Sequence, residues 1–394
     1  MSETHCWRFA RLSEIANVHG GGTPSRENHS SWDGDIPWLT PSEITGTHRK
    51  VTTATHDRIT DSGLRSSGAF LLPAGALLVT TRATLGARTL AGVPMSTNQG
   101  FKNLVFDRSI ANPDFYYHLL ETMIPEMEKR ASGTTFREIS GSQFGAIQVP
   151  VPPLKEQCRI AEVFDVIDAR IRSFLVVISK PSALRSGMIE QHLTAYGETN
   201  AQVRLVDVMM LPSRQVDPRV EPHRSRTLLA PDHVESQTGR ILARVSATDQ
   251  GAISGKYPVA PGDVVLSKIR PYLRKVALAD FEGTCSADMY PLRAKGQIDP
   301  SYLHIALLAE RFSRFAETVS ARTGIPKINR LELAEYSTCF PPLAEQRRML
   351  ASLSAVDEGI DAQLRSHTKL RELKLALTED LLTARVRAPV GAGV

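Results

Sequence analysis

An internal repeat constrains this chain more than any other feature of its sequence. Residues 152–171, PPLKEQCRIAEVFDVIDARI, align without a gap with residues 341–360, PPLAEQRRMLASLSAVDEGI, 189 positions later, and eight of these 20 positions are identical. The same offset places residues 184–195 on residues 373–384. Unrelated segments of average composition agree at roughly one position in fifteen to twenty. The pattern therefore indicates a duplicated module.

The repeat extends more weakly into the regions between these segments. PAGALLVTTR (73–82) is similar to APGDVVLSKIR (260–270), and NPDFYYHLL (112–120) is similar to DPSYLHIALL (299–308), at offsets of 187 to 188. The chain thus consists of a diverged region, a well-kept segment, and a second copy of each. A period this long that occurs twice is not that of a solenoid.

The two well-kept segments have the apolar spacing of coiled-coil helices. Apolar residues in the first recur at steps of four and three, which predicts a stripe facing one partner helix. These residues are Ile160, Phe164, Ile167, Ile171, Phe174 and Ile178. The second stripe contains Met349, Leu353, Val356 and Ile360, turns polar at Gln363 and His367, and resumes at Leu370, Leu373, Leu377, Leu381 and Ala384.

Each predicted helix begins just after a Pro-Pro pair and spans about 40 residues, or roughly 60 Å. Pro181 is expected to interrupt and kink the first helix only, because its counterpart is Leu370. Two stripes of matching length favour helices that pack on each other. The alternative is that both helices are core elements of one globular domain.

The diverged regions have a different pattern, and together with the helices they predict an α+β fold. Short apolar stretches bounded by Gly, Pro and Asn, such as residues 75–81 and 262–268, indicate strands and turns. Short helices are expected after capping residues Asn112 and Asp299. We predict mixed α/β domains over 1–151 and 198–340, helical spacers over 152–197 and 341–386, and a flexible tail over 387–394.

Composition excludes several classes of protein. The chain has 42% hydrophobic and 23% charged residues, as is typical of globular proteins, and its sequence shows no apolar run of transmembrane length. The N-terminus lacks an apolar signal core, so we expect a cytoplasmic protein. Four scattered cysteines without CxxC spacing indicate neither a disulfide framework nor a zinc knuckle. The net charge of +5 is compatible with a polyanionic partner.

No catalytic motif is complete. The glycines at 20–22 are not accompanied by a GxSxG nucleophile, and GxxxxGK[ST] and HExxH are also missing. We expect Gly20–Gly22 to form a tight turn, the alternative being close backbone approach to a ligand. The repeated carboxylates at 156/345 and 168/357 lie on the predicted helices, where caps and ion pairs are the usual roles. A catalytic role and a metal site are therefore not indicated.

Six motifs in order along the first half resemble a known family, the specificity subunits of type I restriction–modification systems. They are GGTPSR (21–26), DIPWLTPSEI (35–44), TTRATLG (80–86), STNQGFKNL (96–104), SGTTFREI (132–139) and VPPLKEQCRIAEVFDVID (151–168). The resemblance covers nearly the whole chain, and the PPL-x-EQ-x-R helix starts are its most specific part.

The resemblance implies two target recognition domains, each reading one half of a bipartite, asymmetric double-stranded DNA site. It implies antiparallel helices that act as a ruler for the spacer and dock two modification (methyltransferase) subunits. Those partners would bring S-adenosylmethionine and methylate adenine, and restriction subunits would add ATP- and Mg-dependent cleavage. No cofactor is expected on this chain, which would itself be non-catalytic and would not contact a membrane.

DNA contacts are expected from Lys, Arg, hydroxyl and amide side chains on loops. In the first reader they are Thr23, Ser25, Arg26, Thr80, Arg82, Thr84, Asn98, Gln99, Lys102, Thr134 and Arg137. In the second they are Ser267, Lys268, Arg270, Tyr272, Arg274, Thr323, Lys327 and Asn329. The second reader departs from the family pattern, because LPSRQVDPR (211–219) replaces GGTPSR and CSADMYPL (285–292) replaces STNQGF.

Two alternatives remain open from sequence, a specificity subunit of a type IIB-like enzyme and a stand-alone DNA-binding protein. A third hypothesis, that the chain is itself a DNA methyltransferase, fails because cofactor and catalytic motifs are missing.

Overall fold

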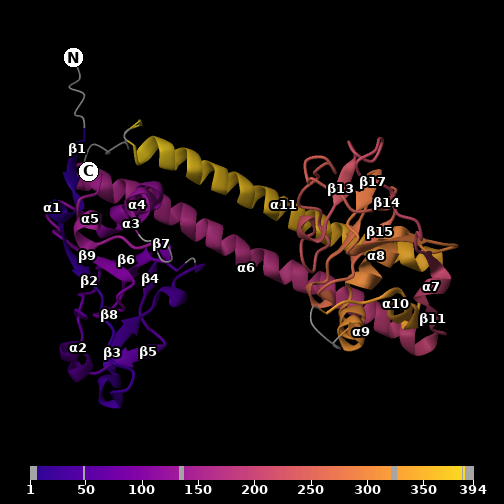
Figure 1. Cartoon of the computed structure of the whole chain (residues 1–394), viewed down its shortest axis with the longest axis horizontal. Coiled ribbons are helices and arrows are strands. Elements are labelled where there is room, and N and C mark those ends of the chain that lie inside the picture. The colour runs from indigo at the N-terminus through magenta and orange to yellow at the C-terminus, as the bar shows by residue number, and fades with distance from the viewer. Residues whose placement is uncertain (1–6, 48, 133–136, 321–325, 384, 387–394) are drawn as a thin grey trace. The chain divides into compact units, whose positions relative to one another are not determined.

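The computed structural model describes residues 7–47, 49–132, 137–320, 326–383 and 385–386 (Figure 1). It divides into two compact units, residues 1–175 with 365–394 (unit 1) and residues 176–364 (unit 2). Each unit combines a mixed α/β part with a section of two long helices, α6 (Leu154–Thr199) and α11 (Leu343–Leu381). The predicted tail at 387–394 lies outside the described residues, as do Thr134, Thr323 and the predicted stripe residue Ala384.

Unit 1 is built on a five-stranded sheet in the order β2-β9-β6-β7-β4, joined by a three-stranded sheet in the order β5-β3-β8. The first sheet contains β2 (Ala16–Gly20), β4 (Val51–Thr52), β6 (Leu77–Arg82), β7 (Thr84–Ala91) and β9 (Phe101–Phe106). The second contains β3 (Trp32–Leu39), β5 (Asp57–Ile59) and β8 (Ser96–Thr97). The remaining elements are the strand pair β1 (Arg8–Arg11) and β10 (Gln148–Val151), and the helices α1 (Leu12–Ile15), α2 (Asp61–Ser66), α3 (Pro113–Thr122), α4 (Ile124–Arg130) and α5 (Gly141–Gly145).

Unit 2 has a four-stranded sheet in the order β12-β18-β15-β16 and a three-stranded sheet in the order β13-β17-β14. The first contains β12 (Met209–Met210), β15 (Val264–Ser267), β16 (Val276–Leu278) and β18 (Met289–Ala294). The second contains β13 (Thr227–Leu229), β14 (Tyr257–Val259) and β17 (Gly283–Cys285). The remaining elements are the strand pair β11 (Val203–Arg204) and β19 (Ser337–Thr338), and the helices α7 (Leu205–Val208), α8 (Pro300–Leu308), α9 (Glu310–Ser320) and α10 (Arg330–Glu335).

The main sheets of the two mixed α/β parts share one four-strand order, which confirms the duplication. The order β2-β9-β6-β7 in unit 1 matches β12-β18-β15-β16 in unit 2, element for element along the chain. A helix follows each sheet, and both start as predicted. The Asn112 side chain accepts from the Asp114 N–H at α3, and the Asp299 side chain accepts from the Ser301 N–H at α8. The α+β fold class predicted from sequence is correct.

A repeated glutamine attaches each long helix to its own mixed α/β part. Gln157 accepts from the Asn112 N–H at 2.7 Å and donates to the carbonyls of Ile110 and Pro152, both at 2.8 Å. Gln346 makes the same three bonds, to the Asp299 N–H and to the carbonyls of Gln297 and Pro341, at 2.8, 3.0 and 2.7 Å. Both side chains are buried. This shared attachment gives a physical role to the glutamine of the helix-start motif.

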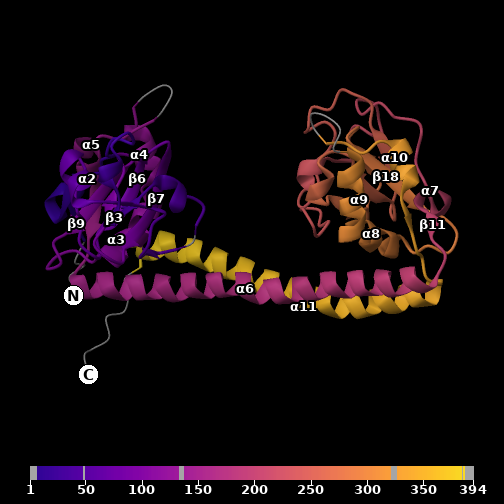
Figure 2. The ribbon, with the colours of Figure 1, turned by 90° about the horizontal axis from the view of Figure 1, so that it is seen from below.

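The two long helices run antiparallel within each unit. In unit 1, Asp168 pairs with Lys374, and further along α6 the Phe174 ring lies 6.1 Å from that of His367. In unit 2, Arg185 pairs with Asp357, and the later residue Leu193 shares a cluster with Met349. Figure 2 shows the mixed α/β part of each unit resting on its own section of the helices.

The predicted stripe residues have two roles. Ile160 and Phe164 are fully buried in the core of unit 1, where they meet α3 as well as Leu381 of α11. Met349 and Leu353 likewise pack on α8 in unit 2. Both sequence interpretations therefore hold in part, because the helices pack on each other and also complete the two domain cores.

One stripe residue was predicted wrongly. Leu373 is 48% exposed, and its neighbour Lys374 occupies the seam position opposite Asp168. The seam steps from Leu370 to Lys374 and then to Leu377, which packs against the core of unit 1. The prediction assigned the apolar Leu373 to the seam, but the charged Lys374 occupies that position.

The expected interruption at Pro181 is also wrong, because α6 is continuous from Leu154 to Thr199 with Pro181 inside it. Proline removes one backbone donor to the carbonyl four residues earlier, here that of Val177. Val177 is 45% exposed, so water can reach this part of the helix. One residue after the proline, the Ser182 hydroxyl donates to the Ile178 carbonyl at 2.9 Å.

Gly20–Gly22 do not form the expected tight turn, and none of them has a positive φ. A Cβ on Gly21 would overlap the Asn98 carbonyl, and one on Gly22 would overlap the backbone of Gly68 and Ala69. Gly21 and Gly22 are needed because other backbone segments of unit 1 pass directly against them.

No helix among the described residues is long and apolar enough to cross a membrane.

Candidate nucleic-acid interface

Several predicted contacts of unit 1 surround one surface hollow of about 320 Å³. It lies between the β6–β7 turn and the turn that connects β8 with β9. Four predicted DNA contacts line it, together with Pro41, Ala83 and Gly100: Arg82, Thr84, Asn98 and Gln99. Residues distant in sequence therefore present polar side chains to one concave surface.

The two turns hold these side chains through local backbone geometry. Ala83, between Arg82 and Thr84, has a φ of 62°, in the left-handed region that tight turns require. In the other turn, the Asn98 side chain accepts from the Gly100 N–H at 2.9 Å. The Thr23 hydroxyl donates to the Gln99 side-chain carbonyl, which links the β2 end to the hollow.

A carboxylate organises the cations beside the hollow. Glu138 lies 3.7 Å from the Arg82 guanidinium and 3.5 Å from the Lys102 ammonium. The neighbouring Arg137 is exposed, and its carbonyl accepts from the Ala83 N–H at 3.2 Å. Since DNA phosphates compete with carboxylates for such cations, this arrangement can exchange an internal ion pair for a phosphate contact.

Arg26 forms a separate group at the second sheet of unit 1. Its guanidinium lies 3.7 Å from the Trp32 ring centroid and 2.6 Å from the Asp57 carboxylate. The hydrogen bond from Arg26 is the main reason that the pKa of Asp57 is lowered. The Arg26 side chain is still 61% exposed, and the nearby Ser25 is also exposed. A stacked, partly paired arginine is oriented in advance for a planar hydrogen-bonding partner.

Unit 2 gathers its predicted cations on a loop surface. Ile269 bridges to Lys327, which brings together two segments far apart in sequence, and Lys327 is exposed. Burial, and then the charge of Lys327, lowers the pKa of Lys268. The exposed Arg270 and the nearby Arg274 flank a short turn in left-handed conformations, with φ of 49° and 48°. That turn exposes 49% of Tyr272.

Two predicted contacts serve the fold instead, and a third, the exposed Asn329, also caps a helix. Thr80 is fully buried, and its hydroxyl donates to the Ala87 carbonyl. Ser267 is 3% exposed and donates to the Ile269 carbonyl. The Asn329 side chain caps α10 by accepting from two backbone N–H groups. Thr80 and Ser267 point inward from strands, so they are not available to DNA.

One residue of the unit 2 surface was missed. The Arg330 guanidinium lies 5.5 Å from the Tyr257 ring centroid and 5.6 Å from that of Tyr290, and it donates to the Pro212 carbonyl at 2.7 Å. Arg330 also contributes to the lowered pKa of Lys268. The tyrosines that position Arg330 come from other segments, so no local sequence pattern indicated it.

A comparison with known protein families shows the family of this chain. The model of the type I restriction modification DNA specificity domain matches residues 5–173 and again residues 238–372. The chain belongs to this family. The first match lies within the first mixed α/β part and α6, and the second within the second mixed part and α11. The DNA specificity domain therefore occurs twice, once in each copy of the duplicated module.

Curated relatives agree with this family. The EcoDI type I restriction enzyme specificity subunit of Escherichia coli is 25% identical over 398 residues, which cover 91% of this chain and 83% of that protein. The MjaIX specificity subunit of Methanocaldococcus jannaschii is 31% identical over 168 residues, which cover 42% of this chain and 39% of that protein.

Solved structures support the fold of the DNA specificity family over the whole chain. A chain from a study of complex assembly and conformational transition of the type I R-M system gives a TM-score of 0.60 at 18% identity, covering 98% of this chain and all of that one. The type I restriction–modification S subunit from M. genitalium gives 0.56 at 13% identity, covering 97% of both chains.

Proposed function

We propose that this chain is the DNA-recognition subunit of a type I restriction–modification complex, in which each mixed α/β part reads one half of a bipartite, asymmetric site. The observation that carries the proposal is the double match of the DNA specificity domain, which falls on the two copies of the duplicated module. Their different surface residues support two different half-sites, because base readout depends on side chains and local shape.

In unit 1, the proposed base and phosphate contacts lie at the hollow that is lined by Arg82, Thr84, Asn98 and Gln99. Arg and Gln side chains form paired hydrogen bonds with guanine and adenine edges in the major groove. In unit 2, the cations at 268, 270, 327 and 330 and the exposed Tyr272 are the corresponding candidates. Their positive charge would supply the salt-dependent part of the affinity.

The chemistry belongs to partner subunits in this proposal. Two modification subunits dock on the long helices, bind S-adenosylmethionine and methylate adenine, and restriction subunits add ATP- and Mg-dependent cleavage. The resemblance in the sequence motifs and the specificity-subunit relatives support this assignment. The lengths of α6 and α11 set the number of unread base pairs between the half-sites.

Methylation mapping tests the proposal. The chain and its modification subunit are produced in a host free of other adenine methylation, and methylated adenines are mapped across the genome. We expect one bipartite motif with a fixed spacer, present only when both proteins are produced. Methylation by the chain alone, or a continuous motif, contradicts the proposal. Tight sequence-specific binding that the modification subunit neither needs nor strengthens supports a stand-alone DNA-binding protein.

A further inference from the structure

Two ion pairs between α6 and α11 are equivalent under the repeat. In unit 1, the Lys374 ammonium lies 2.8 Å from the Asp168 carboxylate. In unit 2, the Arg185 guanidinium lies 2.5 Å from the Asp357 carboxylate. The repeat offset of 189 carries Asp168 onto Asp357 and Arg185 onto Lys374. Each copy of the module therefore contributes one acid and one base, and each pair joins the acid of one copy to the base of the other.

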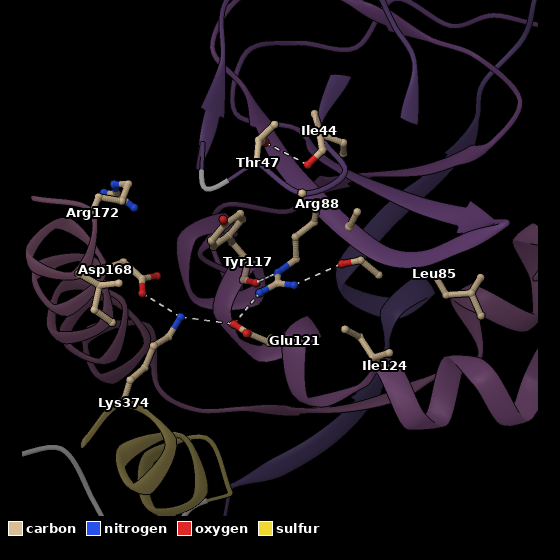
Figure 3. A pocket seen from close by; sticks show the side chains of 14 residues that line it. Ile44, Thr47, Leu85, Arg88, Tyr117, Glu121, Ile124, Asp168, Arg172 and Lys374 are labelled. Carbon is tan, nitrogen blue, oxygen red and sulfur yellow. Dashed lines mark hydrogen bonds and ion pairs between the residues drawn. The ribbon is translucent and has the colours of Figure 1, made fainter. Parts of the chain in front are cut away.

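The pair in unit 1 is more enclosed than an ordinary surface ion pair. Figure 3 shows Lys374 reaching from α11 to a position between Asp168 on α6 and Glu121 on α3, while Arg88 approaches Glu121 from the other side. The side chains of Asp168 and Lys374 are only 16% and 20% exposed. Arg88 and Lys374 oppose the effect of burial and keep the pKa of Glu121 below its ordinary value.

The pair in unit 2 is similarly enclosed on one side. The Arg185 side chain is 19% exposed and the Asp357 side chain is 42% exposed, and both border a hollow that also includes His304 of α8. The Arg185 guanidinium donates a hydrogen bond to the Asp357 carboxylate, so charge and geometry are matched. The mostly buried charge of Arg185 loses water on packing and therefore depends on its partner.

Because the two pairs lie in the seam, they also distinguish the native register of the two helices from displaced registers. If α11 slid by one heptad along α6 in either direction, Asp168 would meet His367 or Leu381 instead of Lys374. By the same arithmetic, Arg185 would meet Leu350 or Leu364 instead of Asp357. After either slide, Asp168 would face no lysine or arginine, and Arg185 would face no carboxylate. A single polar residue in a coiled-coil seam fixes register in the same way, because displaced registers leave it unpaired.

We propose that Asp168–Lys374 and Arg185–Asp357 are positioning pairs that fix the register of α6 on α11, and thereby the DNA spacer that the assembled complex accepts. The spacer part of this inference rests on the proposed function. A slide of one heptad corresponds to about 10 Å of helix, or about three base pairs at 3.4 Å each.

Disulfide trapping measures the register directly. Cysteines replace Phe174 and His367, whose rings are 6.1 Å apart, and a second variant places cysteines at Ile167 and His367 to report a heptad slide. Under mild oxidation, we expect the first pair to cross-link efficiently and the second to cross-link poorly.

Reversing both acids, with Asp168→Lys and Asp357→Arg, should lower the yield of the first pair at least threefold. Glu358→Lys with Glu372→Lys changes the same kind of charge at exposed positions and should leave it unchanged.

Charge exchange separates pairing from a general structural role. Arg185→Asp with Asp357→Arg restores an ion pair in the opposite sense, so it should recover most of the thermal stability that Asp357→Arg alone loses. In methylation maps, the double acid reversal should change or broaden the spacer by about three base pairs, while the exchanged pair should keep the wild-type spacer.

The outcomes distinguish this inference from the proposed function. A wild-type map without a bipartite motif refutes the proposed function, while cross-linking still tests the register. An unchanged cross-link and an unchanged spacer after double acid reversal overturn the inference. An exchanged pair that recovers neither stability nor the wild-type spacer overturns it as well.

Discussion

Gln157 and Gln346 illustrate how one side chain can determine how a whole helix attaches. Each lies in the first turn of its long helix and is bonded to three backbone groups. One N–H and one carbonyl of these belong to the mixed α/β part, and the other carbonyl belongs to the proline pair before the helix. Gln157→Leu keeps the size of the side chain but leaves these groups without partners, so it should cost about 2–4 kcal/mol of unfolding free energy. Gln346→Leu should have a similar effect. Urea denaturation measures both.

Gln363→Leu is the matched control, because Gln363 lies partly exposed in the α11 seam. It should change the unfolding free energy by less than about 1 kcal/mol. Equal losses in all three variants would show that the two buried glutamines have no special role.

His304 predicts a dependence of stability on pH. Burial lowers its pKa to about 4, while the unfolded side chain titrates near its ordinary value of 6.5. The unfolded state therefore binds the proton first, so the contribution of His304 is complete above pH 6.5 and is lost as the pH falls toward 4. His304→Gln should reduce this fall by about 2 kcal/mol between pH 7 and 4.5. Chemical denaturation at several pH values checks this, and parallel curves for the two proteins would contradict it.

At this scale the sequence predicted residue types better than exposure. Arg82 and Thr84 come from one sequence motif and Asn98 and Gln99 from another, and all four line one hollow. Thr80, in the same motif as Arg82, is fully buried. Side chains along a strand alternate between its two faces, and the letters TTRATLG do not show which residues of the strand face inward. The Tyr257 and Tyr290 rings that hold Arg330 come from separate segments, so only the fold brings them together.

Among the elements, the seam of α11 shows where periodicity stops being decisive. Apolar spacing predicted the stripe correctly at Met349 and Leu353 before Gln363, and at Leu377 and Leu381 after His367. Between these parts, the polar interval allowed two continuations. The structure places Lys374 in the seam and leaves Leu373 48% exposed. The energy of an ion pair with Asp168 cannot be read from one helix alone.

This assignment predicts different effects for two neighbouring leucines. Leu373→Gln should change the thermal midpoint by less than about 2 °C, because surface substitutions are worth within about 0.5 kcal/mol. Leu377→Gln should lower the midpoint by about 4–8 °C, because Leu377 packs against the core of unit 1. Thermal denaturation followed by circular dichroism compares them. A larger loss for Leu373→Gln would restore the seam predicted from sequence.

For the whole molecule, the duplication was the most informative feature of the sequence. It predicted two copies of one fold, and the matching strand orders confirm them. The well-kept segments are those that make the same contacts twice, through Gln157 and Gln346 and through the two ion pairs. The diverged segments include the candidate DNA contacts, whose precise targets depend on loop shape as well as side-chain type.

The central claim is that the two copies read the two halves of one DNA site independently. The most direct test compares methylation maps for the wild-type chain and for Arg82→Ala with Gln99→Ala, each produced with the modification subunit. Both changes lie at the hollow of unit 1. We expect altered or relaxed specificity in one half of the motif, with the other half and the spacer unchanged. Changes in both halves, or in neither, would contradict the account.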